Sequence, residues 1–265
     1  DIMGYSTKGD RCKVKKLRNE DGPDSVAMYV GTAAGFGVLH PVFAQGFMTG
    51  VGSKSMYASA TQDCSNKFAV SRHMYGFPFT LPFPDIENAD CLIIVGANPV
   101  ISKWSFLQVP NPVEKLKQFE RRGAKLYFVD PRLTESAQVA GEHVFIRPGS
   151  DVFFYLSFLH ELIGMDGVDR ERIEQYSTGY EDIREIAKDW PAERTAEVTG
   201  ITPETLREMV SDYKRANAAA LYCSTGVNMG GNGTLAFWIQ EVINMVSGNL
   251  DRQGGTLVGR GIFRP

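Results

Sequence analysis

The sequence predicts an α/β protein in which helices flank parallel strands, and three segments indicate this class. Residues 91–95 and 124–129 are almost wholly apolar and too short for helices, which is typical of buried parallel strands. Between them, residues 112–122 carry apolar side chains at helical spacing. Together they form a βαβ unit. Ligands of such sheets bind beyond the carboxyl ends of the strands, so a site is expected in the loops there.

The N-terminal part of the chain predicts fewer and less regular elements. Residues 13–20 indicate the end of an exposed helix, and residues 25–30 indicate a buried strand. A glycine-rich loop at 31–37 then leads to a helix near 38–49. Because the loop lacks the Gly-x-Gly-x-x-Gly spacing of dinucleotide-binding turns, we interpret it as a structural turn.

One segment in the middle of the chain is not expected to form regular secondary structure. Residues 66–75 continue as a helix, but residues 77–84 are punctuated by prolines and are expected to form an extended loop. Its phenylalanines could line a pocket or could simply be buried under a crossover. Residues 143–146 predict a further strand, and Asp151 can cap a strongly apolar helix at 152–163.

The remaining elements alternate in the same way. Three further helices are expected, at residues 168–190 with a break at 178–179, at 203–215 and at 234–246. Residues 193–200 are expected to be a connection, and residues 218–223 a buried strand.

Composition excludes several classes of function. The chain has 265 residues and a net charge of −3, so nothing indicates a nucleic-acid partner. No apolar run approaches the ~20 residues that span a bilayer, so direct membrane insertion is not expected. The chain starts with Asp1 and carries no signal peptide, which is typical of a fragment or a processed chain. Cytoplasmic and periplasmic locations both stay open.

Four cysteines, at positions 12, 64, 91 and 223, show no Cys-x-x-Cys spacing, so spacing indicates neither an iron–sulfur nor a zinc site. Cys91 and Cys223 lie in strand-like runs and are expected to be core thiols. Cys64 instead lies in a polar stretch at a helix start, where the helix dipole and Lys67 favour the thiolate. It could be reactive or metal-ligating, or an ordinary exposed thiol.

Two successive strands end in loops of unusual composition. After the first, Gly96 lets the backbone approach a ligand closely. After the second, Asp130 could accept hydrogen bonds from a ribose and Arg132 could hold a phosphate. Each residue alone could be only a turn residue, but the two loops together favour a nucleotide site.

The ordered set of loops resembles the molybdopterin oxidoreductases of the dimethyl sulfoxide reductase family over nearly the whole chain. The segments that carry the resemblance are residues 22–27, 86–99, 123–134, 147–151, 198–201, 226–228 and 247–255. It implies a molybdenum or tungsten ion bound through two molybdopterin guanine dinucleotides. It also implies two-electron oxidation or reduction of a small-molecule substrate, a chemistry supplied by the cofactor.

The resemblance also implies roles for individual residues. Cys64 stands where the family has its protein ligand to the metal, so it would be both the metal ligand and the catalytic residue. The cofactor-binding residues would be Gly96 and Asn98 at a pyrophosphate, Asp130, Arg132 and Thr134 at ribose and guanine-side groups, Gly149 and Asp151 at the guanine, and Gly226 and Asn228 at the second dinucleotide.

The resemblance further implies a nested domain arrangement. Residues 60–216 would form a Rossmann-like dinucleotide-binding domain inserted into a host α/β domain made of residues 1–59 and 217–265. Strand 25–30 would then lie beside strand 218–223 in one sheet. Cluster-binding cysteines would belong to a missing N-terminal region. The chain would therefore be the central part of a longer enzyme, inactive alone, with an iron–sulfur electron-transfer subunit as its partner.

Two other interpretations compete with this one. The first is a non-catalytic electron-transfer or structural subunit of the same fold, similar to the large subunit of respiratory complex I. The second is an unrelated nicotinamide dehydrogenase, which the absence of Gly-x-Gly-x-x-Gly disfavours. Within the leading interpretation, Ser65 follows Cys64 where formate dehydrogenases of the family carry histidine, which disfavours formate.

Overall fold

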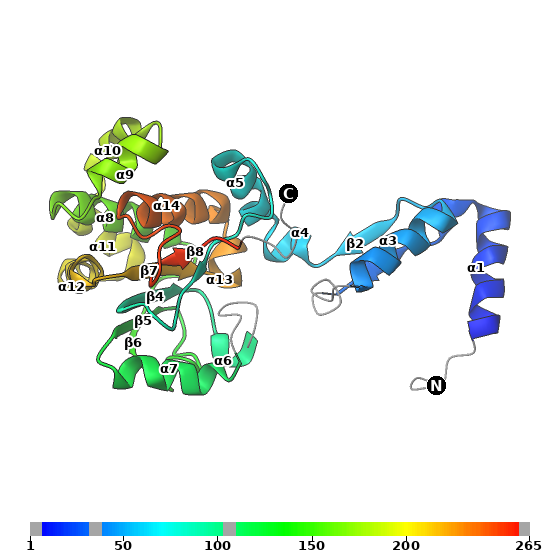
Figure 1. Ribbon diagram of the computed structural model, residues 1–265, viewed down its shortest axis with the longest axis horizontal. Helices are drawn as coiled ribbons and strands as arrows, with labels where there is room; N and C mark the ends of the chain where they lie inside the picture. The colour runs from blue at the N-terminus through cyan, green and yellow to red at the C-terminus, as the bar shows by residue number, and fades with distance from the viewer. Residues whose placement is uncertain (1–6, 32–38, 103–109, 260–265) are drawn as a thin grey trace. The chain divides into compact units, whose positions relative to one another are not determined.

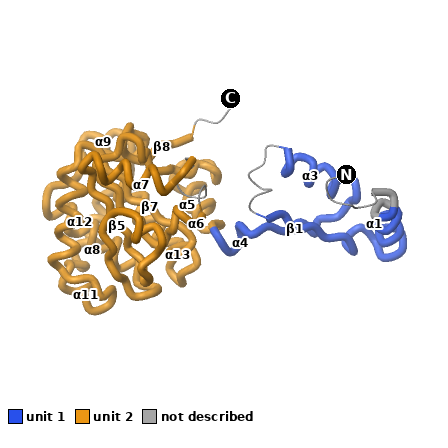
Figure 2. Tube along the Cα trace, turned by 90° about the horizontal axis from the view of Figure 1, so that it is seen from below, with its two compact units in different colours: residues 1–63 blue, residues 64–265 orange. Residues whose placement is uncertain are grey.

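The structure, a computed structural model, describes residues 7–31, 39–102 and 110–259 (Figure 1). It divides into two compact units, residues 1–63 and 64–265 (Figure 2). Apart from Gly31, the glycine-rich loop expected at 31–37 lies outside the described residues. No helix in the described ranges has the length and apolar character needed to cross a membrane.

Unit 1 is built around one pair of short strands. Its elements are α1 (Thr7–Asp21), η1 (Pro23–Ser25), β1 (Met28–Val30), α3 (His40–Val51), β2 (Met56–Ala58) and α4 (Ala60–Asp63). Strands β1 and β2 are parallel, with Met28 opposite Met56. Helix α3 ends at Gly52, whose left-handed φ of 85° is a backbone conformation that glycine adopts without strain.

Unit 2 contains a parallel sheet with the strand order β6-β5-β4-β7. The strands are β4 (Cys91–Val95), β5 (Lys125–Val129), β6 (Glu142–Val144) and β7 (Ala219–Cys223). Cys91 pairs with both Lys125 and Ala219, so the carboxyl ends of the adjacent strands β5, β4 and β7 reach the same edge. A second, antiparallel pair joins β3 (Phe83–Pro84) to β8 (Thr256–Leu257).

The helices of unit 2 are α5 (Ser65–Tyr75), α6 (Pro99–Ser102), α7 (Pro112–Arg121), α8 (Asp151–Gly164), α9 (Arg170–Tyr176), α10 (Tyr180–Lys188), α11 (Ala192–Thr199), α12 (Pro203–Arg215), α13 (Thr225–Asn228) and α14 (Gly233–Val246). Three of them, α7, α9 and α12, are capped at their N-termini by the side chains of Asn111, Asp169 and Thr202. Helix α12 is an example: the Thr202 hydroxyl oxygen accepts a hydrogen bond from the Thr205 amide at 3.2 Å, and Pro203 occupies the first position of the helix.

Alternating side chains of the sheet define two cores. In β4, Cys91, Ile93 and Val95 belong to the larger core, which includes residues of α8, α12 and α14. Leu92 and Ile94 belong to the smaller core, with Leu116 and Phe119 of α7 among its members. Figure 1 shows α8 and α14 on one side of the sheet and α7 on the other. Both faces are thus covered, as parallel sheets require.

The α/β class with parallel strands and flanking helices is therefore confirmed. The break expected at residues 178–179 separates α9 from α10, and Cys91 and Cys223 are buried core thiols. Three local expectations were wrong. The strand expected to be buried at 25–30 begins only at Met28, and its Tyr29 is exposed. Residues 192–199 form helix α11, and the end of the proline-rich loop forms strand β3.

The expected pairing of strand 25–30 with strand 218–223 was also wrong. Strand β7 pairs with β4, and β1 pairs with β2. Side-chain amides meet backbone groups of β7: Asn249 Oδ1 accepts from the Ala219 amide at 3.1 Å, and Asn244 bonds both backbone groups of Leu221. These bonds use backbone groups that a further strand would need. Residues 217–265 group with 64–216 in unit 2, and the nested arrangement of a 60–216 domain inside a host domain stays a prediction.

Candidate functional site

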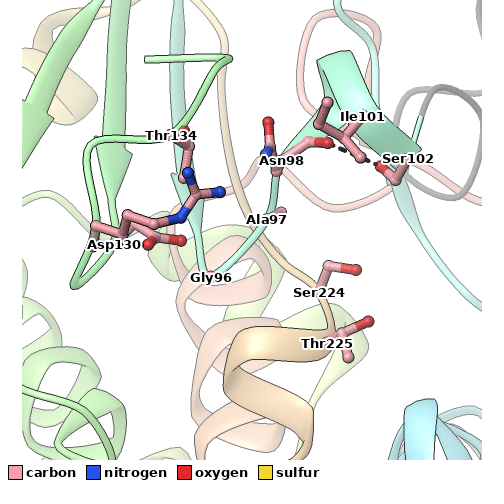
Figure 3. A pocket seen from close by; sticks show the side chains of 10 residues that line it. Gly96, Ala97, Asn98, Ile101, Ser102, Asp130, Thr134, Ser224 and Thr225 are labelled. Atoms are coloured by element: carbon pink, nitrogen blue, oxygen red, sulfur yellow. Dashed lines mark hydrogen bonds between the residues drawn. The ribbon is translucent and has the colours of Figure 1, made fainter. Parts of the chain in front are cut away.

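A polar cavity of about 270 Å³ lies at the carboxyl edge of the parallel sheet. Loops that follow β4, β5 and β7 line it, through Gly96, Ala97, Asn98, Ile101, Ser102, Asp130, Arg132, Thr134, Ser224 and Thr225. Figure 3 shows Asp130 and Thr134 on one side of Gly96–Asn98, and Ser224 and Thr225 on another. Five residues expected from the sequence therefore meet in one cavity: Gly96, Asn98, Asp130, Arg132 and Thr134.

The loops after β4 and β7 touch backbone to backbone. The Gly226 amide donates to Gly96 O at 2.9 Å, and the Gly96 amide donates to Val129 O at 3.0 Å. Gly96 has φ 57°, and a Cβ there would lie 2.8 Å from the Val227 nitrogen. Any side chain at Gly96 would therefore push the two loops apart. The glycine pair sets how closely the walls of the cavity approach.

Asn98 holds the next loop in place. Its Oδ1 accepts from the Ser136 hydroxyl at 2.6 Å, and its Nδ2 donates to Glu135 at 2.6 Å. Arg132 donates to the same Glu135 carboxylate at 3.0 Å. This bond to Arg132 is the main cause that lowers the pKa of Glu135 to about 2. A phosphate approaching Arg132 would compete with an ionised carboxylate.

Asp130 and Thr134 shape the turn that carries Arg132. Asp130 Oδ1 accepts from the Arg132 amide at 2.9 Å, and Thr134 Oγ1 accepts from the Ala137 amide at 3.2 Å. Partial burial raises the pKa of Asp130, while its bond to Arg132 opposes the change. The second carboxylate oxygen of Asp130 is the group with which this loop could meet a ribose hydroxyl.

A third loop brings Asp151 close to the same edge. Asp151 begins α8, and a Cβ built at Gly230 would lie 4.0 Å from its Oδ2. Burial raises the pKa of the Asp151 carboxyl to about 6, and the negative charge of Asp130 adds to the effect. The preceding Gly149 has φ 78° with open space around it. A buried carboxylate of this kind is ready to accept hydrogen bonds from a ligand that donates them.

The raised pKa of Asp151 makes stability depend on pH. Its ordinary pKa is 3.8 and its folded value is about 6, so the folded chain binds more protons than the unfolded chain between these values. The free energy that Asp151 contributes to folding is therefore fully present below about pH 4 and is lost as the pH rises through about 6. The Asp151→Asn variant should exceed the parent by about 2 kcal/mol in unfolding free energy at pH 7. Urea unfolding at pH 4 and 7 checks this, and an equal difference at both would contradict it.

Cys64 caps the N-terminal end of α5 and is partly buried. Its carbonyl oxygen accepts from the Lys67 amide at 2.9 Å. The Lys67 ammonium in turn donates to Cys223 O at 2.6 Å, at the last residue of β7. Among the described residues, the buried Asn66 Nδ2 has no hydrogen-bond partner. Helix α5 therefore starts with a thiol and an unsatisfied buried amide, connected through Lys67 to the sheet edge.

Several expected site residues lie outside the wall of the cavity. They are Cys64, Gly149, Asp151, Gly226 and Asn228. Gly226 supports the wall through Gly96, whereas the Asn228 side chain meets the Cys223 thiol at 3.8 Å. Within the described residues, no three or more His, Cys, Asp and Glu side chains are grouped to hold a metal ion.

Sequence reasoning missed other site residues. Ser224 and Thr225 line the cavity, and Glu135 and Ser136 order its loops. Ser224 and Thr225 directly follow the strand predicted at 218–223, and two hydroxyl side chains at that position could have indicated a place in the site. The bonds of Glu135 and Ser136 to Asn98 join residues more than 35 positions apart, and the sequence gave no signal for them.

The structure is that of an α/β protein with a polar cavity at the carboxyl edge of its parallel sheet. A family model described as "Molybdopterin oxidoreductase" matches residues 11–263. The chain belongs to this family of molybdopterin-dependent oxidoreductases.

Individual relatives agree with the family match. The chain is 30% identical over 179 residues to the F420-dependent formate dehydrogenase 1 subunit alpha of Methanococcus maripaludis, which covers 64% of this chain and 24% of the relative. It is 24% identical over 240 residues to the acetylene hydratase of Syntrophotalea acetylenica, covering 89% and 31%. The solved acetylene hydratase from Pelobacter acetylenicus has the same fold, with a TM-score of 0.76 and 22% identity over 95% of this chain and 33% of that one. The chain thus spans about a quarter to a third of these relatives.

Proposed function

We propose that the chain is the central cofactor-binding part of a molybdenum or tungsten enzyme that uses two molybdopterin guanine dinucleotides. The observation that carries the proposal is the meeting of loops after β4, β5 and β7 in one polar cavity, with the thiol of Cys64 at the start of a neighbouring helix. When bound, the cofactor would supply two-electron chemistry on a small molecule.

The residues present suit such a group. The unsatisfied Asn66 amide offers a buried donor beside Cys64, and thiolate is a soft ligand that suits the metal. Ser224, Thr225 and Arg132 offer hydroxyl and guanidinium donors to phosphate oxygens in the cavity. These groups are the donors that an anionic dinucleotide needs.

The other expected residues take more specific roles in the proposal. Asp151 would accept hydrogen bonds from the N–H groups of guanine, and Gly149 leaves the space for its approach. Gly226 and Asn228 would lie along the second dinucleotide. Asp130 and Thr134 would face ribose and guanine-side groups. Asn98 would act mainly by fixing the loop, since both ends of its amide are already bonded.

The whole enzyme would contain more than this chain. This chain covers only 24% and 31% of two of its relatives, which supports a longer polypeptide. In that polypeptide an N-terminal region would hold an iron–sulfur cluster. An iron–sulfur electron-transfer subunit is the proposed partner, and the name of one relative, a formate dehydrogenase subunit alpha, supports a multisubunit enzyme. The substrate would be a small molecule of the kind that the formate, nitrate and acetylene enzymes among the relatives are named for.

Cofactor analysis of the purified full-length protein tests the proposal. We expect molybdenum or tungsten by mass spectrometry, and two guanine nucleotides released per metal ion by acid hydrolysis. A folded protein with neither metal nor guanine nucleotide would overturn the proposal and favour a non-catalytic subunit of the same fold.

A further inference from the structure

Glu135 is an acidic residue beside the cavity, and its carboxylate binds a donor of the cavity wall. The two terminal nitrogens of Arg132 donate to its two oxygens at 3.0 and 3.4 Å. Arg132 lines the cavity, and Glu135 is not among the lining residues. An arginine contacts phosphate with the same fork of two N–H donors that it uses for a carboxylate. The carboxylate of Glu135 therefore takes the hydrogen bonds that Arg132 would offer to a phosphate group.

Asn98 directs this carboxylate toward Arg132. Its Nδ2 donates at 2.6 Å to Glu135 Oε2, the same oxygen that accepts from Arg132. The Asn98 amide is itself oriented by Ser136, whose hydroxyl and backbone amide both donate to Asn98 Oδ1, at 2.6 and 3.3 Å. The bond to Arg132 is the main cause that lowers the pKa of Glu135 to about 2, so the carboxylate is ionised near neutral pH. Glu135 is thus an oriented, negatively charged competitor for Arg132.

The contact between Glu135 and Arg132 can open without disturbing the loop. The side chains of Arg132 and Glu135 are 59% and 47% exposed, and exposed ion pairs contribute little to stability. Other bonds hold the backbone: Asp130 Oδ1 accepts from the Arg132 amide, and Thr134 Oγ1 accepts from the Ala137 amide. The Glu135 side chain can therefore turn into solvent while the wall of the cavity keeps its shape.

A diphosphate is the kind of anion that can displace this carboxylate. Ser224 and Thr225 carry hydroxyl groups on another part of the wall (Figure 3). A diphosphate has more acceptor oxygens than one carboxylate, so it can accept from Arg132 and also from these hydroxyls. A small anion that meets Arg132 alone gains little beyond the bonds that it replaces. Competition by Glu135 therefore favours diphosphates over smaller anions in this cavity.

We propose that Glu135 is a specificity-determining residue, which competes with the diphosphate of the dinucleotide for Arg132 and turns away from Arg132 when the diphosphate binds. The dinucleotide must then supply more hydrogen bonds than the carboxylate gives up. The inference deepens the proposed function and rests on it, because the diphosphate belongs to the cofactor that is assigned to this cavity.

Isothermal titration calorimetry on the full-length protein, purified from a host that makes no molybdopterin, tests this role. Pyrophosphate and guanosine diphosphate are the probes. Glu135→Gln removes the charge, and Glu135→Ala also removes the acceptor oxygens. Both variants should bind both probes about two- to five-fold more tightly than the parent, which is the range expected for loss of an exposed ion pair. Equal or weaker binding in both variants would overturn the role of Glu135.

Glu114 provides the matched control. It lies on α7 and pairs with Arg121 at 3.1 Å, and both side chains are exposed. Glu114→Gln therefore removes the same charge from a similar arginine–carboxylate pair whose members do not line the cavity. Its affinity for both probes should equal that of the parent. A gain as large as that of Glu135→Gln would mean that net charge alone is responsible, and it would refute the proposal.

An Arg132→Gln background separates competition from a field that acts at a distance. This substitution removes the group for which the carboxylate and the diphosphate compete. Adding Glu135→Gln should then leave the affinity for pyrophosphate equal to that of Arg132→Gln alone, because the two residues act as a pair. The same gain in both backgrounds would show that Glu135 does not act by occupying Arg132.

The outcomes separate the two proposals. Native full-length protein with neither metal nor guanine nucleotide would refute the proposed function. If the native protein contains the cofactor but the Glu135 variants bind pyrophosphate and guanosine diphosphate no more tightly than the parent, only the role of Glu135 is refuted. Binding that is undetectable in the parent and in both Glu135 variants refutes this role as well.

Discussion

Replacing Cys64 by alanine in the full-length enzyme is expected to reduce turnover by more than about 100-fold. Loss of an outer partner of a metal ligand already costs about 10–100-fold in metal affinity or activity, and Cys64 is proposed as the ligand itself. Steady-state kinetics and metal content, measured on the same preparation, check this. Thermal unfolding should change little, because Cys64 is partly exposed at a helix end.

Cys12 is the matched control for this substitution. It is an exposed free thiol on α1, so Cys12→Ala makes the same chemical change at a residue that is not among the proposed site residues. We expect parental turnover and metal content. If Cys64→Ala retains full turnover and a full complement of metal, Cys64 is not the ligand.

Replacing Gly96 by alanine is expected to lower the free energy of unfolding by about 2–5 kcal/mol. The left-handed φ of 57° costs an alanine about 1–2 kcal/mol. The 2.8 Å approach of its Cβ to the Val227 nitrogen adds an overpacking cost of about 1–3 kcal/mol. For a unit of this size the melting temperature should fall by about 2–4 °C per kcal/mol. Cofactor retention should fall as well, because the loops after β4 and β7 must separate.

Two further glycine variants separate strain from contact. Gly149→Ala has φ 78° but nothing within 4 Å of the new Cβ, so it should show the backbone cost alone. Gly226→Ala places its Cβ 2.7 Å from Gly96 Cα without a left-handed φ, so it should show the contact alone. Equal melting temperatures for Gly96→Ala and Gly149→Ala would contradict the close contact of the two loops.

The sheet was predictable because its strands depend on local composition. The runs at 91–95 and 219–223 are apolar and buried throughout, and the run at 125–129 is apolar and buried after Lys125, as strands covered on both faces require. The partner of β7 was not predictable in this way. The Asn244 and Asn249 side chains that bond its backbone come from residues more than 20 positions away.

Helix α11 shows a different reason for failure. Its sequence contains β-branched Thr195 and Thr199 and ends before Gly200, which resembles a connection. Burial of both threonines in the folded chain, each bonding a backbone carbonyl within the helix, stabilises the helix in spite of this local signal.

The site was predictable at the level of loops but not of contacts. The position of Cys64 at a helix start and the meeting of Gly96 with Asp130 follow from the order of elements. The burial of Lys67 could not be predicted from the sequence, since it depends on the rings of Tyr222 and Phe237, which lie more than 150 positions away. The engagement of Asn98 by Ser136 and Glu135 was hidden for the same reason.

X-ray absorption at the metal edge of the full-length enzyme tests the central claim most directly. The claim is that the sulfur of Cys64 binds the metal of a cofactor held at the carboxyl edge of the parallel sheet. The Cys64→Asp variant offers oxygen in place of sulfur. We predict that its spectrum shows one metal–sulfur contact fewer and one metal–oxygen contact more than the parent. Identical sulfur shells in the two proteins would contradict the assignment.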